Sequence, residues 1–335
     1  LLGGGTGNGV TSTPTVGNGV VYVTSWSGRV FAVSARTGVP RWQYDTGSGG
    51  ALGVQSSATL TADGRVLVGD SLATLHCLDA RTGARLWMTS IGNPAVDHVW
   101  ASPAVANGRV FMGIASHSDN PCTNGRLVTL DLDTGAVLWT RQTVPDRICT
   151  NDTGIACTTD ADCGPGTCVA SRGAGITATV AVDPTGETVY ANTVGCFTFP
   201  SNGDEDSILK LDAATGAASW ITRVQPAEQF GAAFYHDFGF LNGPLLVDAD
   251  DGLGGTRPLV VSGSKDGSLY ALDPASGTPV WTRAILPAPV TPAFAGFGLF
   301  NGGVGFANQR FYATLFQFTP AVVPAPQPTI STECG

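Results

Sequence analysis

The sequence predicts an all-β protein, a β-propeller of four-stranded antiparallel blades, and three observations support that prediction. One phrase recurs five times along the 335 residues, the chain carries 45 glycines and 21 prolines, and only 13% of its residues are charged. Glycine and proline punctuate short strands and interrupt helices, so this composition favours a turn-rich β fold. A repeating sheet-forming unit of roughly 40 residues or more is typical of a propeller.

Each repeat contains a hydrophobic strand, a glycine turn, a second strand that usually ends in Leu-Asp, and a Thr-Gly turn, which is Ser-Gly in the fifth repeat. A tryptophan follows four residues after the turn glycine in all five repeats. We expect the Asp and the Thr-Gly turn to fix the last hairpin, because Asp bonds its own backbone and Gly supplies a positive φ. We expect the tryptophan to pack between neighbouring blades. The five tryptophans at this position are Trp42, Trp87, Trp139, Trp220 and Trp281.

The strands themselves are indicated by alternation of apolar and polar residues, as at 20–24 and 30–33. A sixth unit starts at 302–316 but lacks the Thr-Gly and tryptophan ending. About seven or eight blades would make a complete ring, so either divergent terminal residues complete it or part of the protein is missing. We predict a single propeller over residues 1–320 and a proline-rich tail over 321–335.

The longest interval between repeat tryptophans, from Trp139 to Trp220, contains a polar stretch with four cysteines. A zinc site would favour a C-x-x-C pair or nearby histidines, and the stretch has neither. A loop held by disulfides, inserted at about 146–172, is the better interpretation. Disulfides persist outside the cytosol, so we expect a periplasmic or extracellular protein. The cysteines are Cys149, Cys157, Cys163 and Cys168.

Composition also excludes several classes of partner. The net charge of −9 argues against nucleic acid, because binding to phosphates requires a basic surface. No apolar run reaches the roughly 18 residues of a membrane span, so we expect no transmembrane segment. The sequence has no C-x-x-C-H motif for haem attachment. Its four histidines, His76, His98, His117 and His236, are too scattered along the chain to indicate a metal site.

The repeat phrase A-L-D-x-x-[ST]-G-x-x-x-W resembles that of enzymes that use pyrroloquinoline quinone (PQQ). The order of the intervening segments is similar to the quinoprotein alcohol dehydrogenases, particularly the polyvinyl-alcohol dehydrogenase branch, over residues 13–313. The resemblance implies a central channel that holds PQQ on a calcium ion. It also implies that a carboxylate takes the alcohol proton while hydride passes to the quinone.

Two segments of the second half resemble the family's cofactor site. Lys265, in VVSGSKDGSLYALD, matches the lysine that bonds the quinone oxygens, although a Lys-Asp-Gly hairpin turn would also explain it. His236 and Asp237, in FYHDFG, resemble a D-x-D-F-G segment that enters the channel. The resemblance therefore implies cofactor contacts for Lys265 and His236 and a general base for Asp237, unless Asp237 only caps a loop.

Other positions match the family less closely. Asp119 replaces a calcium-binding glutamate, and Cys122 is what remains of a Cys-Cys pair that forms a vicinal disulfide against PQQ. Asn192 lies near the family's calcium-binding Asn but out of register. Residues 204–206, Asp-Glu-Asp, lie near the catalytic Asp without a clean match, and Asp204 is our second candidate base.

Two hypotheses remain open from the sequence. In the first, the chain is a PQQ- and calcium-dependent alcohol dehydrogenase with a degenerate site. In the second, it is a non-catalytic propeller that acts as a scaffold, subunit or interaction module at the cell surface, since other proteins use the same repeat without catalysis. Such a propeller would bind a protein partner through one face or one sheet edge. The incomplete Cys-Cys pair and the absent haem motif favour the second hypothesis.

Overall fold

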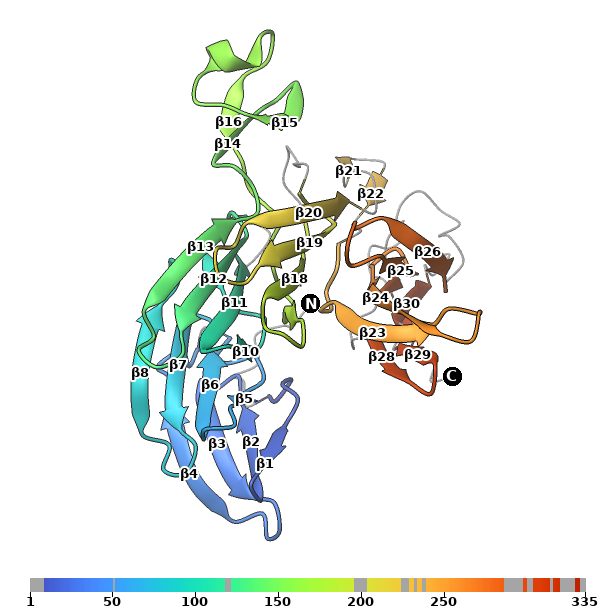
Figure 1. The fold of residues 1–335 in the computed structure, drawn as a ribbon. Coiled ribbons are helices and arrows are strands. Elements are labelled where there is room, and N and C mark those ends of the chain that lie inside the picture. Colours follow the sequence, from blue (N-terminus) through green and yellow to red (C-terminus); the bar gives the residue numbers. More distant parts are fainter. Residues whose placement is uncertain are drawn as a thin grey trace. The chain divides into compact units, whose positions relative to one another are not determined.

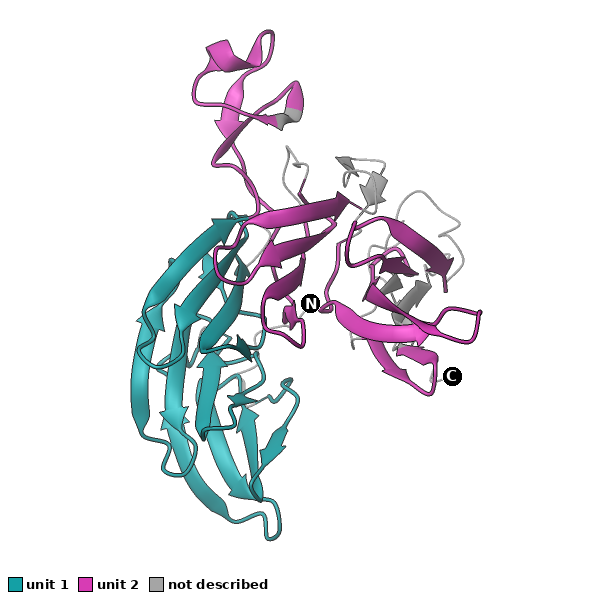
Figure 2. Ribbon diagram, viewed as in Figure 1, with its two compact units in different colours: residues 1–142 teal, residues 143–335 magenta. Residues whose placement is uncertain are grey.

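The structure is a computed structural model that describes most of the chain. The described residues are 9–50, 52–117, 122–195, 204–223, 229–231, 234–236, 239–285, 298–299, 304–313, 316–319 and 329–331. Their secondary structure is β, apart from one short 3-10 helix, η1 (Asp160–Cys163). The chain divides into two compact units, Leu1–Gln142 and Thr143–Gly335, which Figure 2 colours separately. None of the described residues forms a helix long and apolar enough to cross a membrane.

Unit 1 contains three antiparallel sheets, one for each of the first three repeats (Figure 1). Their strands are hydrogen-bonded in chain order, as expected when short turns return the chain beside the strand just completed. The first sheet contains β1 (Thr15–Gly17), β2 (Val20–Thr24), β3 (Arg29–Ser34) and β4 (Pro40–Asp45); the second β5 (Thr59–Leu60), β6 (Arg65–Gly69), β7 (Thr74–Asp79) and β8 (Arg85–Ser90); the third β10 (Ala104–Ala106), β11 (Arg109–Ser116), β12 (Arg126–Asp131) and β13 (Val137–Gln142), with β9 (Asp97–His98) on the end of β11.

Unit 2 contains the sheets of the fourth and fifth repeats and several smaller ones. The fourth repeat forms β17 (Ala181–Val182), β18 (Thr188–Asn192), β19 (Ser207–Asp212) and β20 (Ala218–Arg223); the fifth forms β23 (Leu245–Asp250), β24 (Thr256–Gly263), β25 (Ser268–Leu272) and β26 (Pro279–Ala284). The smaller strands are β21 (Gln229–Gly231), β22 (Phe234–His236), β27 (Gly298–Leu299), β28 (Val304–Ala307), β29 (Arg310–Ala313), β30 (Phe316–Thr319) and β31 (Thr329–Ser331).

These five sheets confirm the predicted four-stranded antiparallel blades. The pair β28–β29 is the partial sixth repeat, and β31 places part of the proline-rich tail beside β30. The predicted boundary between propeller and tail at residue 320 stays a prediction.

The repeat tryptophan occupies the same register in every one of the five sheets. It pairs with a residue of the third strand, and the residue just before it in the fourth strand is the extra residue of a β-bulge. The five pairs are Ala32 with Trp42, Cys77 with Trp87, Thr129 with Trp139, Lys210 with Trp220 and Ala271 with Trp281. The Asp at the end of the third strand fixes the turn into the fourth strand, as predicted. In the third sheet, Asp131 Oδ1 accepts hydrogen bonds from Thr134 N at 2.8 Å and Thr134 Oγ1 at 2.7 Å.

Within each unit, the repeat tryptophan of one sheet packs on the turn glycine of the next sheet. Trp87 Nε1 donates to Leu132 O at 3.0 Å, and a Cβ added to Gly135 would lie 2.6 Å from Trp87 Cδ2. Trp220 makes the same contacts with Pro274 O, at 3.1 Å, and with Gly277. The turn glycine is therefore required both for its positive φ and for the space above it. The prediction that this tryptophan packs between blades is confirmed for Trp42, Trp87 and Trp220.

Substitution of Gly135 by alanine should destabilise unit 1 more than substitution of Gly108. Both residues have a φ of +71°, so alanine strains the backbone equally, but nothing lies within 4 Å of a Cβ at Gly108. In Gly135→Ala, the clash of the added methyl group with Trp87 should add about 1–3 kcal/mol to the loss of unfolding free energy. Denaturant unfolding of the two variants measures this difference. Equal midpoints for both would mean that the tryptophan contact contributes nothing.

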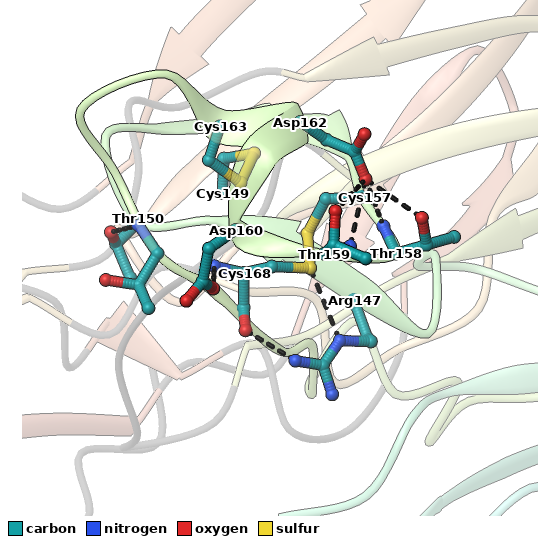
Figure 3. The surroundings of a disulfide bond; sticks show 11 residues. Arg147, Cys149, Thr150, Cys157, Thr158, Thr159, Asp160, Asp162, Cys163 and Cys168 are labelled. Atoms are coloured by element: carbon teal, nitrogen blue, oxygen red, sulfur yellow. Dashed lines mark hydrogen bonds between the residues drawn. A yellow bond between two sulfur atoms is a disulfide. The ribbon is translucent and has the colours of Figure 1, made fainter.

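The inserted loop in unit 2 is held together by two disulfides, Cys149–Cys163 and Cys157–Cys168. Its sheet contains β14 (Arg147–Cys149), β15 (Asp152–Ala156) and β16 (Cys168–Ala170). The four cysteines themselves form its buried cluster, so the cross-links replace a hydrophobic core. Asp162 Oδ2 accepts hydrogen bonds from Thr158 N and Thr159 N (Figure 3), and these bonds lower the pKa of Asp162 to about 2.

Reduction of the two disulfides should expose residues 146–172 to proteases while the four-stranded sheets remain folded. The cysteine cluster is what holds the loop, and removal of a disulfide from a small cross-linked unit typically costs about 2–5 kcal/mol. Limited proteolysis with mass spectrometry, with and without reductant, locates the cleavage sites. Identical cleavage patterns under both conditions would show that the disulfides do not hold the loop.

Candidate functional site

Lys265 lies in the hairpin turn between β24 and β25 and is half-buried. The turn is fixed by the next residue, because Asp266 accepts hydrogen bonds from Ser268 N at 2.8 Å and Tyr270 Oη at 2.5 Å. Lys265 N donates to Gly239 O at 3.0 Å. The hairpin therefore ties the cationic residue of this turn to the segment that leads into β23.

Three consecutive acidic residues, 204–206, lie just before β19, and the structure separates them by burial. Asp204 is half-buried, whereas Glu205 and Asp206 are both fully buried. Thr193 Oγ1 donates to Asp204 O at 2.6 Å and accepts from Ser207 N at 3.0 Å, which holds the segment against the end of β18. Asp206 has a φ of +53°, a conformation that Asp tolerates better than most residues and that clusters at functional sites.

Two glycines make room for the buried carboxylates. A Cβ on Gly173 would collide with Glu205 Oε1, and a Cβ on Gly239 would lie 3.1 Å from Asp206 Oδ1. Gly239 is also the residue whose carbonyl accepts the Lys265 amide. Segments from four different parts of unit 2 thus converge, and they bring the Lys265 turn beside the acidic pair.

Asn192, a predicted cofactor contact, makes hydrogen bonds within the fold in this structure. It is buried at the end of β18, and its Nδ2 donates to Asn242 O at 2.7 Å and to Ser262 Oγ at 3.1 Å. Its Oδ1 accepts from the same Ser262 hydroxyl at 3.2 Å. These bonds link the sheets of the fourth and fifth repeats, so Asn192 acts here as a structural amide.

Several predicted site residues fall outside the described residues. These are Asp119 and Asp237; His236 is described only for its backbone, in β22. Cys122 is buried and disulfide-bonded. Among the described cysteines Cys77 is free, and burial raises the pKa of its thiol to about 12, so it is not a nucleophile at neutral pH.

The clustered cysteines are not a metal centre. The Sγ atoms of Cys149, Cys157 and Cys163 lie within 4.8 Å of one another, but all three belong to disulfides. A sulfur in a disulfide is not a thiolate and cannot serve as a zinc ligand. The sequence-based preference for disulfides over zinc is confirmed.

A second polar cluster, in unit 1, was not singled out by sequence. His98 is fully buried, and its ring stacks on Trp100 with 4.1 Å between centroids. The centroid of the His117 ring lies 5.4 Å from that of His98. Burial, with a smaller contribution from His117, lowers the pKa of His98 to about 3. These two histidines are 19 positions apart and meet because β9 pairs with the end of β11.

The sequence profile of a family described as "PQQ: Glucose/ethanol/alcohol dehydrogenase, beta-propeller domain" matches residues 4–293, most of the chain. The chain belongs to this family. Among curated members, a polyvinylalcohol dehydrogenase from Pseudomonas sp. is 29% identical over 293 residues, which cover 80% of this chain and 44% of that protein. A quinohemoprotein alcohol dehydrogenase from Pseudomonas putida is 27% identical and is covered over 40% of its length.

Solved structures show the same propeller fold. A quinohemoprotein alcohol dehydrogenase from Pseudomonas putida HK5 superposes with a TM-score of 0.68 at 24% identity, over 84% of this chain and 42% of that one. The corresponding enzyme from Comamonas testosteroni gives 0.67 at 23% identity, over 87% and 46%. The chain therefore spans less than half the length of these four relatives.

The residues of unit 2 partly fit the cofactors of the family. Glu205 and Asp206 offer the hard carboxylate oxygens that calcium prefers, and they are held in place by the glycines that pack against them. Lys265 offers an ammonium group from the adjoining turn, whose backbone amide donates to Gly239 O. Asn192 stays a prediction for the cofactor site, and in this structure its amide is bonded to the neighbouring sheet. The residues that best fit the family's cofactors are thus Glu205, Asp206 and Lys265.

Proposed function

We propose that this chain is the PQQ-binding propeller of an extracytoplasmic alcohol dehydrogenase, with a site that departs from the family pattern. The observation that carries the proposal is the convergence of the Lys265 turn with the buried pair Glu205 and Asp206. The relatives' names support an alcohol as substrate, and the similarity to polyvinylalcohol dehydrogenase supports a secondary alcohol.

The proposed roles follow from position and burial. Glu205 would contribute carboxylate oxygens to calcium. Lys265 would place its ammonium group beside the quinone oxygens, where a fixed positive charge stabilises developing negative charge. Asp206 would accept the hydroxyl proton of the alcohol. It lies beside Gly239, whose carbonyl accepts a hydrogen bond from the Lys265 amide. PQQ, when bound, would supply the two-electron acceptor for the alcohol.

The assignment of Asp206 as the base refines the prediction made from sequence. Asp204 is half-buried and contributes its backbone carbonyl to Thr193, whereas Asp206 is fully buried next to Gly239. A base that is shielded from water and fixed by its surroundings is better suited to proton transfer. Asp204 and Asp237 remain the alternative bases.

An extracytoplasmic location is part of the proposal and is supported by the two disulfides of the inserted loop. Disulfides of this kind form and persist in oxidising compartments.

The alternative function is a non-catalytic propeller that binds a protein partner. It is favoured by Asn192, whose amide is bonded within the fold, and by the replacement of the Cys-Cys pair by Cys122 alone, which is disulfide-bonded. A propeller of this type would keep its sheets intact without cofactor and would bury one face against its partner.

Reconstitution of the full chain with PQQ and calcium distinguishes the two functions. We expect poly(vinyl alcohol) or a small secondary alcohol to reduce an artificial phenazine acceptor, and we expect this reaction to need PQQ, calcium and alcohol together. Reduction that is independent of PQQ, or the absence of reduction despite bound PQQ and calcium, would contradict the catalytic role and favour the alternative.

A further inference from the structure

His98 is a buried histidine whose two ring nitrogens both lack a hydrogen-bond partner. A neutral imidazole carries one donor and one acceptor, and nearly all such buried groups in proteins are bonded. The other buried histidine of unit 1 follows that rule, because His76 Nε2 bonds Asp70 at 3.0 Å and its Nδ1 bonds Tyr44 at 3.2 Å. Both ring nitrogens of His98 are therefore open to a ligand that the protein itself does not supply.

His117 places a second imidazole against the first. Its ring lies edge-on to His98 with 5.4 Å between centroids, at an interplanar angle of 69°. His117 is half-buried, so a ligand between the two rings can be reached from solvent. A further unpartnered atom, the buried hydroxyl of Thr123, belongs to the same region, since Thr123 N donates to Ser116 Oγ at 3.1 Å.

The surroundings hold the His98 ring and the backbone of His117 in place. Trp100 stacks on His98 and donates its Nε1 hydrogen to Ser116 O at 2.9 Å, at the end of β11. The residue before His98, Asp97, is buried and pairs with Arg126, with 2.5 Å between Oδ2 and Nη2. The His117 amide donates to Val96 O at 2.8 Å. Ligand side chains fixed in this way bind without a large loss of rotamer freedom.

We propose that His98 and His117 bind a divalent transition-metal ion such as Zn²⁺ or Cu²⁺, with water completing its coordination. Metal–nitrogen bonds of about 2.0–2.1 Å at a tetrahedral angle place two imidazole centroids roughly 5 Å apart, close to the separation in this structure. Imidazole suits zinc, copper and nickel, whereas calcium prefers oxygen. The site is independent of the proposed dehydrogenase function, because it uses none of the residues assigned to PQQ or calcium.

The test is calorimetric titration of the full chain with ZnCl₂, after dialysis against EDTA, without a polyhistidine tag and with excess calcium present. We expect a single equivalent of zinc to bind and calcium not to compete. His117→Gln should weaken binding by more than the roughly 10–100-fold that loss of an outer-shell partner costs. His76→Gln is the matched control, because His76 has partners for both nitrogens, and it should retain the affinity. With Cu²⁺, electron paramagnetic resonance should show coupling to imidazole nitrogen.

Absence of zinc and copper binding by the unaltered chain would overturn the proposal. Unchanged affinity in His117→Gln would do the same, because the bound ion would then lie elsewhere. His117 is half-buried, so this substitution tests the site even where a change at the fully buried His98 prevents folding.

Discussion

Replacement of Asp206 by asparagine is expected to lower kcat for alcohol-dependent reduction of a phenazine acceptor by roughly 10²–10⁴-fold, the usual contribution of a general base. Asparagine has nearly the same shape and fits the same space beside Gly239, but it cannot accept a proton. The prediction depends on the burial of Asp206 and its position next to the segment that holds the Lys265 turn. Steady-state kinetics of the PQQ- and calcium-reconstituted variant measure the effect, while circular dichroism confirms that the sheets are retained.

Asp204→Asn is the matched comparison for Asp206→Asn, since it lies two residues away and makes the same chemical change. We expect a smaller loss of kcat, because Asp204 is half-buried and the hydrogen bond with Thr193 uses its backbone carbonyl. If Asp204→Asn is the variant that loses activity while Asp206→Asn retains it, the assignment from sequence is right and the structural assignment is wrong.

Replacement of Asp70 by alanine should lower the free energy of unfolding of unit 1 by about 3–5 kcal/mol, the cost of breaking a buried polar pair from one side. Asp70 and His76 are each about 1% exposed, and Asp70 Oδ2 lies 3.0 Å from His76 Nε2. Its Oδ1 also accepts hydrogen bonds from Leu72 N and Thr74 N, both at 3.0 Å. Alanine would leave an imidazole nitrogen and two backbone amides without partners in the protein interior.

Asp63→Ala is the control for this loss of stability. Asp63 is in the same sheet's β5–β6 turn and pairs with Arg65 at 3.3 Å, but its side chain is 50% exposed. Exposed ion pairs contribute about 0–1 kcal/mol, so this variant should unfold close to the unaltered chain. Denaturant unfolding followed by tryptophan fluorescence compares the two. A loss for Asp70→Ala no larger than that for Asp63→Ala would mean that the buried pair does not stabilise the sheet.

The repeat architecture could be predicted because its determinants are local in sequence. The Asp131 side chain, the Thr134 hydroxyl and Gly135 lie within five consecutive positions and together specify one turn. The tryptophan four residues later then has a fixed register, and its contact with the next turn repeats wherever the phrase recurs within a unit. The cysteine spacing likewise indicated disulfides, but four cysteines allow three pairings, and sequence could not choose among them.

The candidate site could be predicted only in part, because its geometry depends on contacts between distant segments. Lys265 and the acidic residues 204–206 were visible as polar residues in turns. The burial of Glu205 and Asp206 was not, since it arises from Gly173 and Gly239, which lie more than 30 positions away. Acidic residues are normally exposed, so nothing in the sequence indicated that Asp206 was a better candidate base than Asp204.

The two histidines of unit 1 illustrate the same limit. His98 and His117 are 19 positions apart in sequence, and neither falls in a metal-binding motif. They come together because β9 pairs with the last residues of β11, with His98 opposite Ala115. A pairing between a strand of two residues and the end of a longer one has no periodic signature, so the sequence alone does not indicate that the two histidines meet.

The central claim, that unit 2 holds PQQ on calcium beside Lys265, is tested most directly by calorimetric titration of the full chain with PQQ in the presence and absence of calcium. The account predicts binding that requires calcium and that weakens in Lys265→Ala, because the alanine variant lacks the ammonium group beside the quinone oxygens. Absence of PQQ binding at saturating calcium, or binding equally tight in Lys265→Ala, would contradict it.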